Sequence, residues 1–286
     1  MEAIMRTVQT IDELKAIISN QKQQTIGFVA TMGYLHEGHK TLLTKARAEN
    51  EFVVASIFVN PAQFGPNEDL DRYPRDIERD TKIATEAGVD LLFVPTPDEM
   101  YPFESGITIN AGEISTKLCG ATRPGHFDGV LKVVSKLFHL IQPTKAYFGQ
   151  KDAQQLAIIK LFVEAYNFPL EIVGVPTVRE EDGLAKSSRN VFLSEKERDE
   201  APHIYKALNL AKDTWLRTKD IEGAIDGAKQ YINENTSGKI DYLEALAYPT
   251  LQPVNEYTEE VLFATAVFFE KARLIDNIIV NIKEVQ

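Results

Sequence analysis

Short apolar runs alternate with helical patterns through residues 25–176, and this alternation limits the folds open to the chain. The apolar runs, rich in β-branched and aromatic residues, lie at 25–30, 52–59, 90–95, 146–149 and 171–176. Helical patterns lie between them, at 38–49, 76–87, 129–141 and 152–166. Continuous apolar strands separated by helices are typical of a parallel sheet covered on both faces. We therefore expect an α/β fold with a Rossmann-like domain over residues 1–177, binding ligands at the carboxyl ends of its strands.

The pattern changes near Val178, where the polar, irregular stretch 179–190 indicates a loop and a domain boundary. Two helical stretches and three strand-like runs follow, at 195–217, 220–235, 240–247, 261–269 and 273–282. Helices followed by strands favour a small α+β domain. We expect this domain to span residues 178–286 and to carry the KSSRN loop.

The charge of the chain argues against several classes of partner. Its 286 residues carry a formal net charge of −11, which disfavours nucleic acid or an anionic membrane as partner. No apolar run approaches the length of a membrane-spanning helix, and the N-terminus lacks a signal-sequence pattern. The single cysteine, Cys119, excludes an intrachain disulfide and fits a cytoplasmic location.

The sharpest local signal is the segment Thr31–His39, TMGYLHEGH, which follows the first apolar run and opens the next helix. A helix N-terminus offers unpaired N–H groups and a partial positive charge, both of which suit phosphate. Gly33 and Gly38 allow the backbone to approach a ligand closely. His36 and His39, three residues apart, can both donate to phosphate oxygens. The alternatives are a surface turn with two histidines or a pair of metal ligands.

Two further segments carry phosphate-binding chemistry. In FGQKD (148–152), Lys151 supplies a mobile ammonium, and Asp152 could bind a ribose hydroxyl, hold Mg²⁺ or cap the helix that follows. The boundary loop contains hydroxyls and a guanidinium that can stabilise departing pyrophosphate, at Lys186, Ser187, Ser188 and Arg189. A flexible, solvated linker is the alternative interpretation of this loop.

These segments carry a family resemblance. ATMGYLHEGH (30–39) resembles the HIGH-type signature of the adenylylating nucleotidyltransferases, and KSSR resembles the mobile KMSKS-type loop of the same superfamily. Five segments, two of which contain FGQKD and KSSR, are similar in order and spacing to those of pantothenate synthetases: SIFVNPAQFG (56–65), DRYPRDIERD (71–80), LCGATRPGHFDGV (118–130), FGQKDAQQL (148–156) and PTVREEDGLAKSSRNVFLS (176–194). The resemblance covers about residues 25–195.

The resemblance implies a reaction and a set of site residues. It implies ATP-dependent ligation of (R)-pantoate and β-alanine through pantoyl adenylate, with Mg²⁺, in pantothenate and coenzyme A biosynthesis, by a homodimer. ATP would be bound by Met32, Gly33, Tyr34, Leu35, His36, Glu37, Gly38, His39, Gly149, Gln150, Lys151, Asp152, Val178, Lys186, Ser187, Ser188 and Arg189. The catalytic groups among these would be His36, His39, Lys151 and Arg189. Gln63 and Gln155 would bind pantoate, with Asn60 a weaker candidate, and Asp80 and Asp152 are the candidate metal ligands.

Other interpretations stay open at this point. The chain could be another nucleotidyltransferase with a phosphate acceptor, or a protein that binds ATP without turning it over. Asp80 could belong to a solvated helix face. Arg123 and His126 could flank the site as a lid or be ordinary loop residues, and Cys119 is interpreted as a packing residue. Three departures from the family pattern, Ala30, Gln150 and Lys186, remove no group that the chemistry requires.

Overall fold

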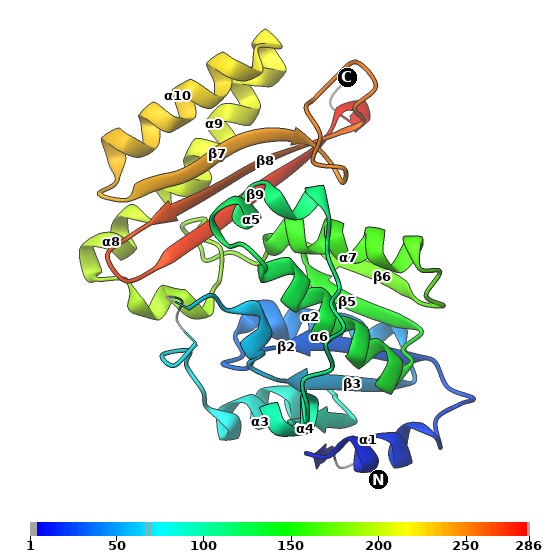
Figure 1. Cartoon of the computed structure of the whole chain (residues 1–286). Helices are drawn as coiled ribbons and strands as arrows, with labels where there is room; N and C mark the ends of the chain where they lie inside the picture. Colours follow the sequence, from blue (N-terminus) through cyan, green and yellow to red (C-terminus); the bar gives the residue numbers. More distant parts are fainter. Residues whose placement is uncertain (1–4, 67, 69, 285–286) are drawn as a thin grey trace. The chain divides into compact units, whose positions relative to one another are not determined.

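The computed structural model describes residues 5–66, 68 and 70–284, and the chain divides into two compact units (Figure 1). The first unit comprises Met1–Ser115, Arg123–Gln150 and Ile158–Pro176. The second comprises Thr116–Thr122, Lys151–Ala157 and Thr177–Gln286. The chain therefore passes between the units more than once, and two short early segments belong with its C-terminal part.

The first unit is built on a six-stranded sheet with the order β1-β4-β3-β2-β5-β6, in which every pairing is parallel. Its strands are β1 (Arg6–Val8), β2 (Ile26–Thr31), β3 (Phe52–Ile57), β4 (Leu91–Phe93), β5 (Lys145–Gly149) and β6 (Glu171–Val175). Five of them lie where apolar runs predicted strands, so the expected parallel α/β fold is confirmed. The sequence pattern did not indicate β1, because three residues at a sheet edge are too short for a periodic signal.

Helices cover both faces of this sheet. Alternate residues of β2 point to opposite faces, so Phe28 contacts the ring of Phe138 on one side, 6.4 Å between centroids. Val29 lies on the other side, in the cluster that contains Leu43. The helices of this part of the chain are α1 (Ile11–Ile18), α2 (Glu37–Glu49), α3 (Ile77–Glu86), α4 (Pro97–Met100), α6 (His126–Ile141) and α7 (Ala153–Ala165), the last beginning in the second unit.

Local sequence signals explain where these helices begin and end. Thr10 and Glu13 form a capping box at the start of α1, and the Asp76 side chain accepts from the N–H of Arg79 at the start of α3. Gly88, with φ +82°, follows the last residues of α3, where a left-handed residue is common. The helices predicted at 38–49, 76–87, 129–141 and 152–166 are confirmed within a few residues.

The second unit contains a three-stranded antiparallel sheet, β7 (Lys239–Ala247), β8 (Glu260–Phe268) and β9 (Arg273–Asn281). Helices α9 (His203–Thr218) and α10 (Ile221–Asn235) lie together against it (Figure 1). Trp215 of α9 packs on Phe263 of β8, with 5.6 Å between ring centroids. The expected α+β character of this part is confirmed, and the short helix α5 (Cys119–Thr122) belongs to the same unit.

One predicted helix is wrong. We expected a single helix over 195–217, but the structure divides it into α8 (Glu195–Glu200) and α9. The break falls at Pro202, which has no backbone N–H to donate to the preceding turn. Pro202 stands instead at the N-cap of α9. The first N–H groups of any helix have no partner within it, so the missing N–H of proline costs no hydrogen bond at this position. No helix among the described residues is long and apolar enough to cross a bilayer.

The close approach of α6 to η1 (Pro61–Gln63) yields a stability prediction. A Cβ at Gly129 of α6 would lie 2.0 Å from the carbonyl oxygen of Ala62. Gly129→Ala should therefore lower the free energy of unfolding, measured by urea denaturation, by roughly 3 kcal/mol, because backbone must move to make room.

The matched control is Gly227→Ala in α10, where a Cβ would meet nothing within 4 Å. An alanine there should raise the free energy of unfolding by about 0.5–1 kcal/mol, because it restricts the unfolded chain and favours helix. Equal urea-unfolding midpoints for the two variants would contradict the view that the close approach of α6 to η1 requires glycine at position 129.

Candidate active site

The loop after β2 has a conformation that only its particular residues allow. The hydroxyl of Thr31 donates to the carbonyl oxygen of Ser56, at 2.8 Å, and accepts from the N–H of Gly33, at 3.2 Å. Gly33 has φ +85°, and a Cβ there would lie 3.0 Å from both Asp80 Oδ2 and a methyl of Ile57. Glycine is therefore required at this turn, both for its backbone angle and for space.

A buried carboxylate holds the next two residues of the loop. Asp80, in the first turn of α3, is 1% exposed. Its Oδ2 accepts from the N–H of Tyr34 at 2.7 Å, and its Oδ1 accepts from the N–H of Leu35 at 2.6 Å. Burial raises the pKa of Asp80, and the two N–H groups oppose that rise because they favour the charged form. Asp80 therefore anchors the loop that leads into α2.

This burial decides two expectations about Asp80. The alternative of a solvated helix face is wrong, since the residue is almost wholly buried. Mg²⁺ keeps several waters and requires room for them, and a carboxylate at 1% exposure beneath the loop offers none. Asp80 does not fit a magnesium ion. The other candidate ligand, Asp152, is exposed, and no group of three or more His, Cys, Asp or Glu residues suitable for a metal occurs within 5–66, 68 and 70–284.

The two histidines lie side by side at the start of α2. His36 is the N-cap, and its Nδ1 accepts from the N–H of Gly38 at 3.1 Å. His39 Nδ1 accepts from the N–H of His36 at 3.3 Å, and the ring centroids are 4.1 Å apart. A ring nitrogen that accepts a hydrogen bond carries no proton, so each neutral ring has its proton on Nε2. Both imidazoles are thereby set to act as donors through Nε2.

The sheet order brings three of the predicted segments to one edge. β2 lies between β3 and β5, and all three are parallel. Their carboxyl ends therefore meet at the same edge, with the histidine loop after β2, Asn60 and Gln63 after β3, and Gly149 as the last residue of β5, followed by Gln150. This is the position at which open parallel sheets bind ligands.

Asn60 and Gln63 are held by a dense set of hydrogen bonds. Asn60 Nδ2 donates to Gln63 Oε1 and to the carbonyl oxygen of Gly129, each at 3.0 Å. Asn60 Oδ1 accepts from the N–H of Ala62 at 3.2 Å and from the hydroxyl of Tyr101 at 2.9 Å. Sequence reasoning missed Tyr101, because it lies outside every motif and no sequence pattern marks it.

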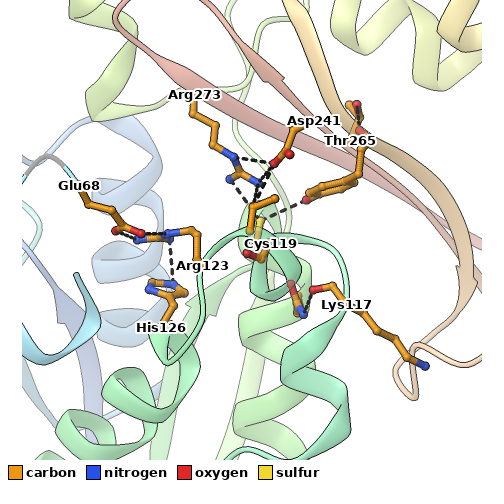
Figure 2. Close-up of polar contacts among 11 residues, drawn as sticks. Glu68, Lys117, Cys119, Arg123, His126, Asp241, Thr265 and Arg273 are labelled. Atoms are coloured by element: carbon orange, nitrogen blue, oxygen red, sulfur yellow. Dashed lines mark hydrogen bonds and ion pairs between the residues drawn. The ribbon is translucent and has the colours of Figure 1, made fainter. Parts of the chain in front are cut away.

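A second chain of contacts, whose members Glu68, Arg123 and His126 are shown in Figure 2, ends at the backbone of Gln63. Glu68 accepts from Nε of Arg123 at 2.8 Å, and Nη1 of Arg123 lies 3.0 Å from Nε2 of His126. Because arginine can only donate, Nε2 of His126 accepts, and its Nδ1–H donates to the carbonyl oxygen of Gln63 at 2.8 Å. Burial alone would raise the pKa of Glu68, but the Arg123 guanidinium lowers it overall. Arg123 and His126 thus support the Gln63 turn.

In the second unit, a small pocket is lined by Lys151, Ser187, Asn190 and Asp276 among other residues. Asn277 Nδ2 donates to the carbonyl oxygen of Lys151 at 2.8 Å. Asp276 forms a two-point ion pair with Arg179, at 2.6 and 2.9 Å. Burial raises the pKa of Asp276, against the opposing effect of the Arg179 guanidinium. β9 therefore fixes the main chain at Lys151.

The KSSR segment is hydrogen-bonded within the second unit. The N–H of Lys186 donates to the carbonyl oxygen of Val178 at 2.9 Å, and the Lys186 ammonium lies 3.3 Å from a carboxylate oxygen of Glu180. Ser187 caps the short turn η4 (Ser188–Phe192) by accepting from the N–H of Arg189 at 3.2 Å. These contacts give the loop a defined conformation.

Two further residues were assigned from the sequence. Gln155 is half-buried on α7, and its neighbour Gln154 is buried and donates to the carbonyl oxygen of Lys117 at 2.7 Å. Cys119 Sγ lies 3.2 Å from the hydroxyl of Tyr242, beside Arg273 (Figure 2). Cys119 is buried, as expected of a packing residue.

Comparison with known proteins identifies the family. The sequence model described as pantoate-beta-alanine ligase matches residues 6–279. The chain belongs to the pantoate-beta-alanine ligase family. Pantothenate synthetase from Lysinibacillus sphaericus (strain C3-41) is 61% identical over 282 residues, which are 98% of this chain and 99% of the relative. That from Bacillus subtilis (strain 168) is 53% identical over 285 residues, 99% of each chain.

Solved structures of pantoate-beta-alanine ligases agree with the fold. The pantothenate synthetase of Thermus thermophilus has a TM-score of 0.91 and 48% identity, covering 96% of this chain and 99% of its own. The pantoate-beta-alanine ligase of Francisella tularensis, complexed with beta-gamma ATP and beta-alanine, has a TM-score of 0.80 and 36% identity, covering 96% and 97%. As a member of this family, the chain is a ligase of pantothenate biosynthesis.

The anchoring of the histidine loop by Asp80 can be tested. Asp80→Asn keeps the shape of the side chain but sets its NH₂ group against the backbone N–H of either Tyr34 or Leu35. We expect the free energy of unfolding to fall by about 1–3 kcal/mol, because a buried donor loses its acceptor. Urea denaturation measures the change.

Asp76→Asn is the matched control, since Asp76 also accepts from a backbone N–H but stands at an exposed N-cap, where asparagine serves equally well. Its unfolding midpoint should stay close to that of the parent. If Asp80→Asn were as stable as Asp76→Asn, the anchoring role would be refuted.

Proposed function

We propose that the ligase works in two steps with ATP. The carboxylate oxygen of (R)-pantoate attacks the α-phosphorus of MgATP, a P–O bond forms, and the bond to pyrophosphate breaks. The amine of β-alanine then attacks the acyl carbon of pantoyl adenylate. An amide bond forms, AMP departs, and the amine loses a proton. The Francisella tularensis structure supports ATP and β-alanine as ligands, because both nucleotide and beta-alanine are named in that complex.

The pair of imidazoles at the start of α2 carries this proposal. Both rings accept at Nδ1, so two Nε2–H donors come from one helix N-terminus, together with its backbone N–H groups. Negative charge grows on the α-phosphate oxygens during attack, and preorganised donors stabilise that charge. His36 and His39 are therefore assigned to the α-phosphate. The surrounding loop residues, Met32, Gly33, Tyr34, Leu35, Glu37 and Gly38, are assigned to the nucleotide.

The second unit is proposed to handle the rest of the nucleotide. Lys151, Ser187 and Arg189 are assigned to the phosphates and to the departing pyrophosphate, with Lys186 and Ser188 beside them. The backbone of Val178 is assigned to adenine, and Asp152 to the ribose and phosphates, together with Gly149 and Gln150 of the first unit. Magnesium enters as part of the MgATP substrate, since Asp80 does not fit it. We also propose that the nucleotide- and pantoate-binding domain spans residues 1–177 and that the smaller domain with the KSSRN loop spans residues 178–286.

Two glutamines are proposed to bind pantoate. Gln63 and Gln155 have neutral amides that can donate to a carboxylate and accept from a hydroxyl, which suits a small hydroxy acid. Gln63 is also assigned to β-alanine. The homodimer and the cytoplasmic location implied by the resemblance and by the single cysteine stay predictions.

Isotope exchange tests the first step. With pantoate present and β-alanine absent, labelled pyrophosphate should enter ATP, because adenylation is reversible while the acceptor is missing. Omitting pantoate should abolish the exchange. An enzyme that makes pantothenate without any pantoate-dependent exchange would refute the adenylate route.

Substitution of the assigned phosphate ligands tests their roles. His39→Ala and Lys151→Ala should each lower the single-turnover rate of adenylation by about 10²–10³-fold, as for loss of one charge-stabilising donor. His139→Ala is the control, because His139 lies exposed on α6 with its Nδ1 2.7 Å from its own helix carbonyl at Ser135. Unchanged adenylation in both site variants would refute the assignment.

A further inference from the structure

We infer that Tyr101 and Asn60 form a positioning relay that fixes which end of the Gln63 amide faces the substrate. This inference rests on the proposed function, in which Gln63 binds pantoate. All three residues belong to the first unit, and Tyr101 follows α4 directly. Neither Tyr101 nor Asn60 touches substrate in this scheme.

The orientation of the Asn60 amide follows from its fixed neighbours. The carbonyl oxygen of Gly129 can only accept, so the Asn60 atom 3.0 Å from it is Nδ2. The N–H of Ala62 can only donate, so the atom 3.2 Å from it is Oδ1. The Tyr101 hydroxyl, 2.9 Å from the same Oδ1, must then be a donor. Asn60 is 1% exposed, and its two donors and two acceptor sites are all used.

The orientation of Gln63 follows in turn. The second N–H of Asn60 Nδ2 donates to Gln63 Oε1 at 3.0 Å, so Gln63 Nε2 is the end of the amide that Asn60 does not bind. Nε2 donates to Met32 Sδ at 3.1 Å, and a thioether is a weak acceptor. A carboxylate or hydroxyl oxygen of a substrate is a much better hydrogen-bond acceptor than this sulfur. The relay therefore keeps Nε2, a donor, available to pantoate in the proposed scheme and prevents the repulsion that an inverted amide, with Oε1 in its place, would cause.

The Tyr101 hydroxyl is itself held in place and kept protonated. The ring packs edge-on to Phe58, 6.0 Å between centroids, and the ammonium of Lys132 lies 4.8 Å from its centroid. Burial raises the pKa of Tyr101 to about 12. The hydroxyl is thus a donor throughout the neutral range, and its bond to Asn60 does not switch with pH.

Tyr101→Phe tests the relay, because it removes one hydroxyl and keeps the ring. We expect kcat/KM for pantoate to fall about tenfold through a higher KM, with KM for ATP unchanged, since one hydrogen bond to the Asn60 oxygen is lost. Tyr248→Phe is the control. Tyr248 OH is buried without a hydrogen-bond partner among the described residues, and its loss should leave every kinetic constant as in the parent.

A double-mutant cycle distinguishes positioning from packing. In a Gln63→Ala background, Tyr101→Phe should have no further effect on pantoate, because the group that it orients is absent. An effect of the same size in both backgrounds would overturn the relay. So would parent-like pantoate kinetics in Tyr101→Phe.

A second variant covers the case in which Tyr101→Phe does not fold, and an activity assay of the parent enzyme tests the proposed function by itself. If Tyr101→Phe fails to fold by thermal melting, Asn60→Asp serves instead. Its carboxylate still accepts from Tyr101 and Ala62 but cannot donate to Gln63, so kcat/KM for pantoate should fall at least tenfold, and parent-like kinetics would overturn the relay. If the parent enzyme makes no pantothenate from pantoate, β-alanine and ATP, the proposed function itself fails, a result distinct from failure of the relay.

Discussion

The site of the first unit depends on one buried carboxylate. Asp80 accepts from two successive N–H groups, of Tyr34 and Leu35, and so sets the path of the chain between the end of β2 and the start of α2. Without that path, His36 would not stand at the N-cap and its Nδ1 would not meet the N–H of Gly38. The tautomers of both histidines follow from this backbone, and with them the direction in which each ring can donate. A carboxylate that is assigned to no ligand thus determines the direction in which two histidines, both proposed to bind phosphate, can donate.

The sequence predicted the parallel sheet and its helices well, because burial on both faces leaves a strong pattern of apolar runs. It failed where the deciding factor lay outside that pattern. β1 is only three residues long, and its pairing with β4 depends on residues far away in the chain. The break before α9 depends on a single residue, Pro202, whose missing N–H outweighs a continuous helical pattern.

The candidate site shows the same limit more sharply. The histidines, glycines and Gln63 were identified because motifs mark them. The sequence around Asp80 indicates a solvated helix face or a metal ligand, because nothing in that segment reveals that the partners of Asp80 lie 45 and 46 residues earlier. No sequence pattern marks Tyr101, since its one decisive contact reaches Asn60 across 41 residues. Motifs identify residues proposed to meet ligands, whereas residues that hold them are found only from the folded chain.

These positioning contacts also explain how a chain with a net charge of −11 can be suited to an anionic nucleotide. The donors assigned to the phosphates and to pantoate in the first unit are imidazole, amide and backbone N–H groups, none of which requires a formal positive charge. Such donors act at short range and only in the right direction, so a negative total charge hardly weakens them. Direction, however, has to be enforced. The buried network around Asp80, Asn60 and Tyr101 enforces it, because an inverted Asn60 amide would set its NH₂ group against the N–H of Ala62 and leave buried groups unsatisfied.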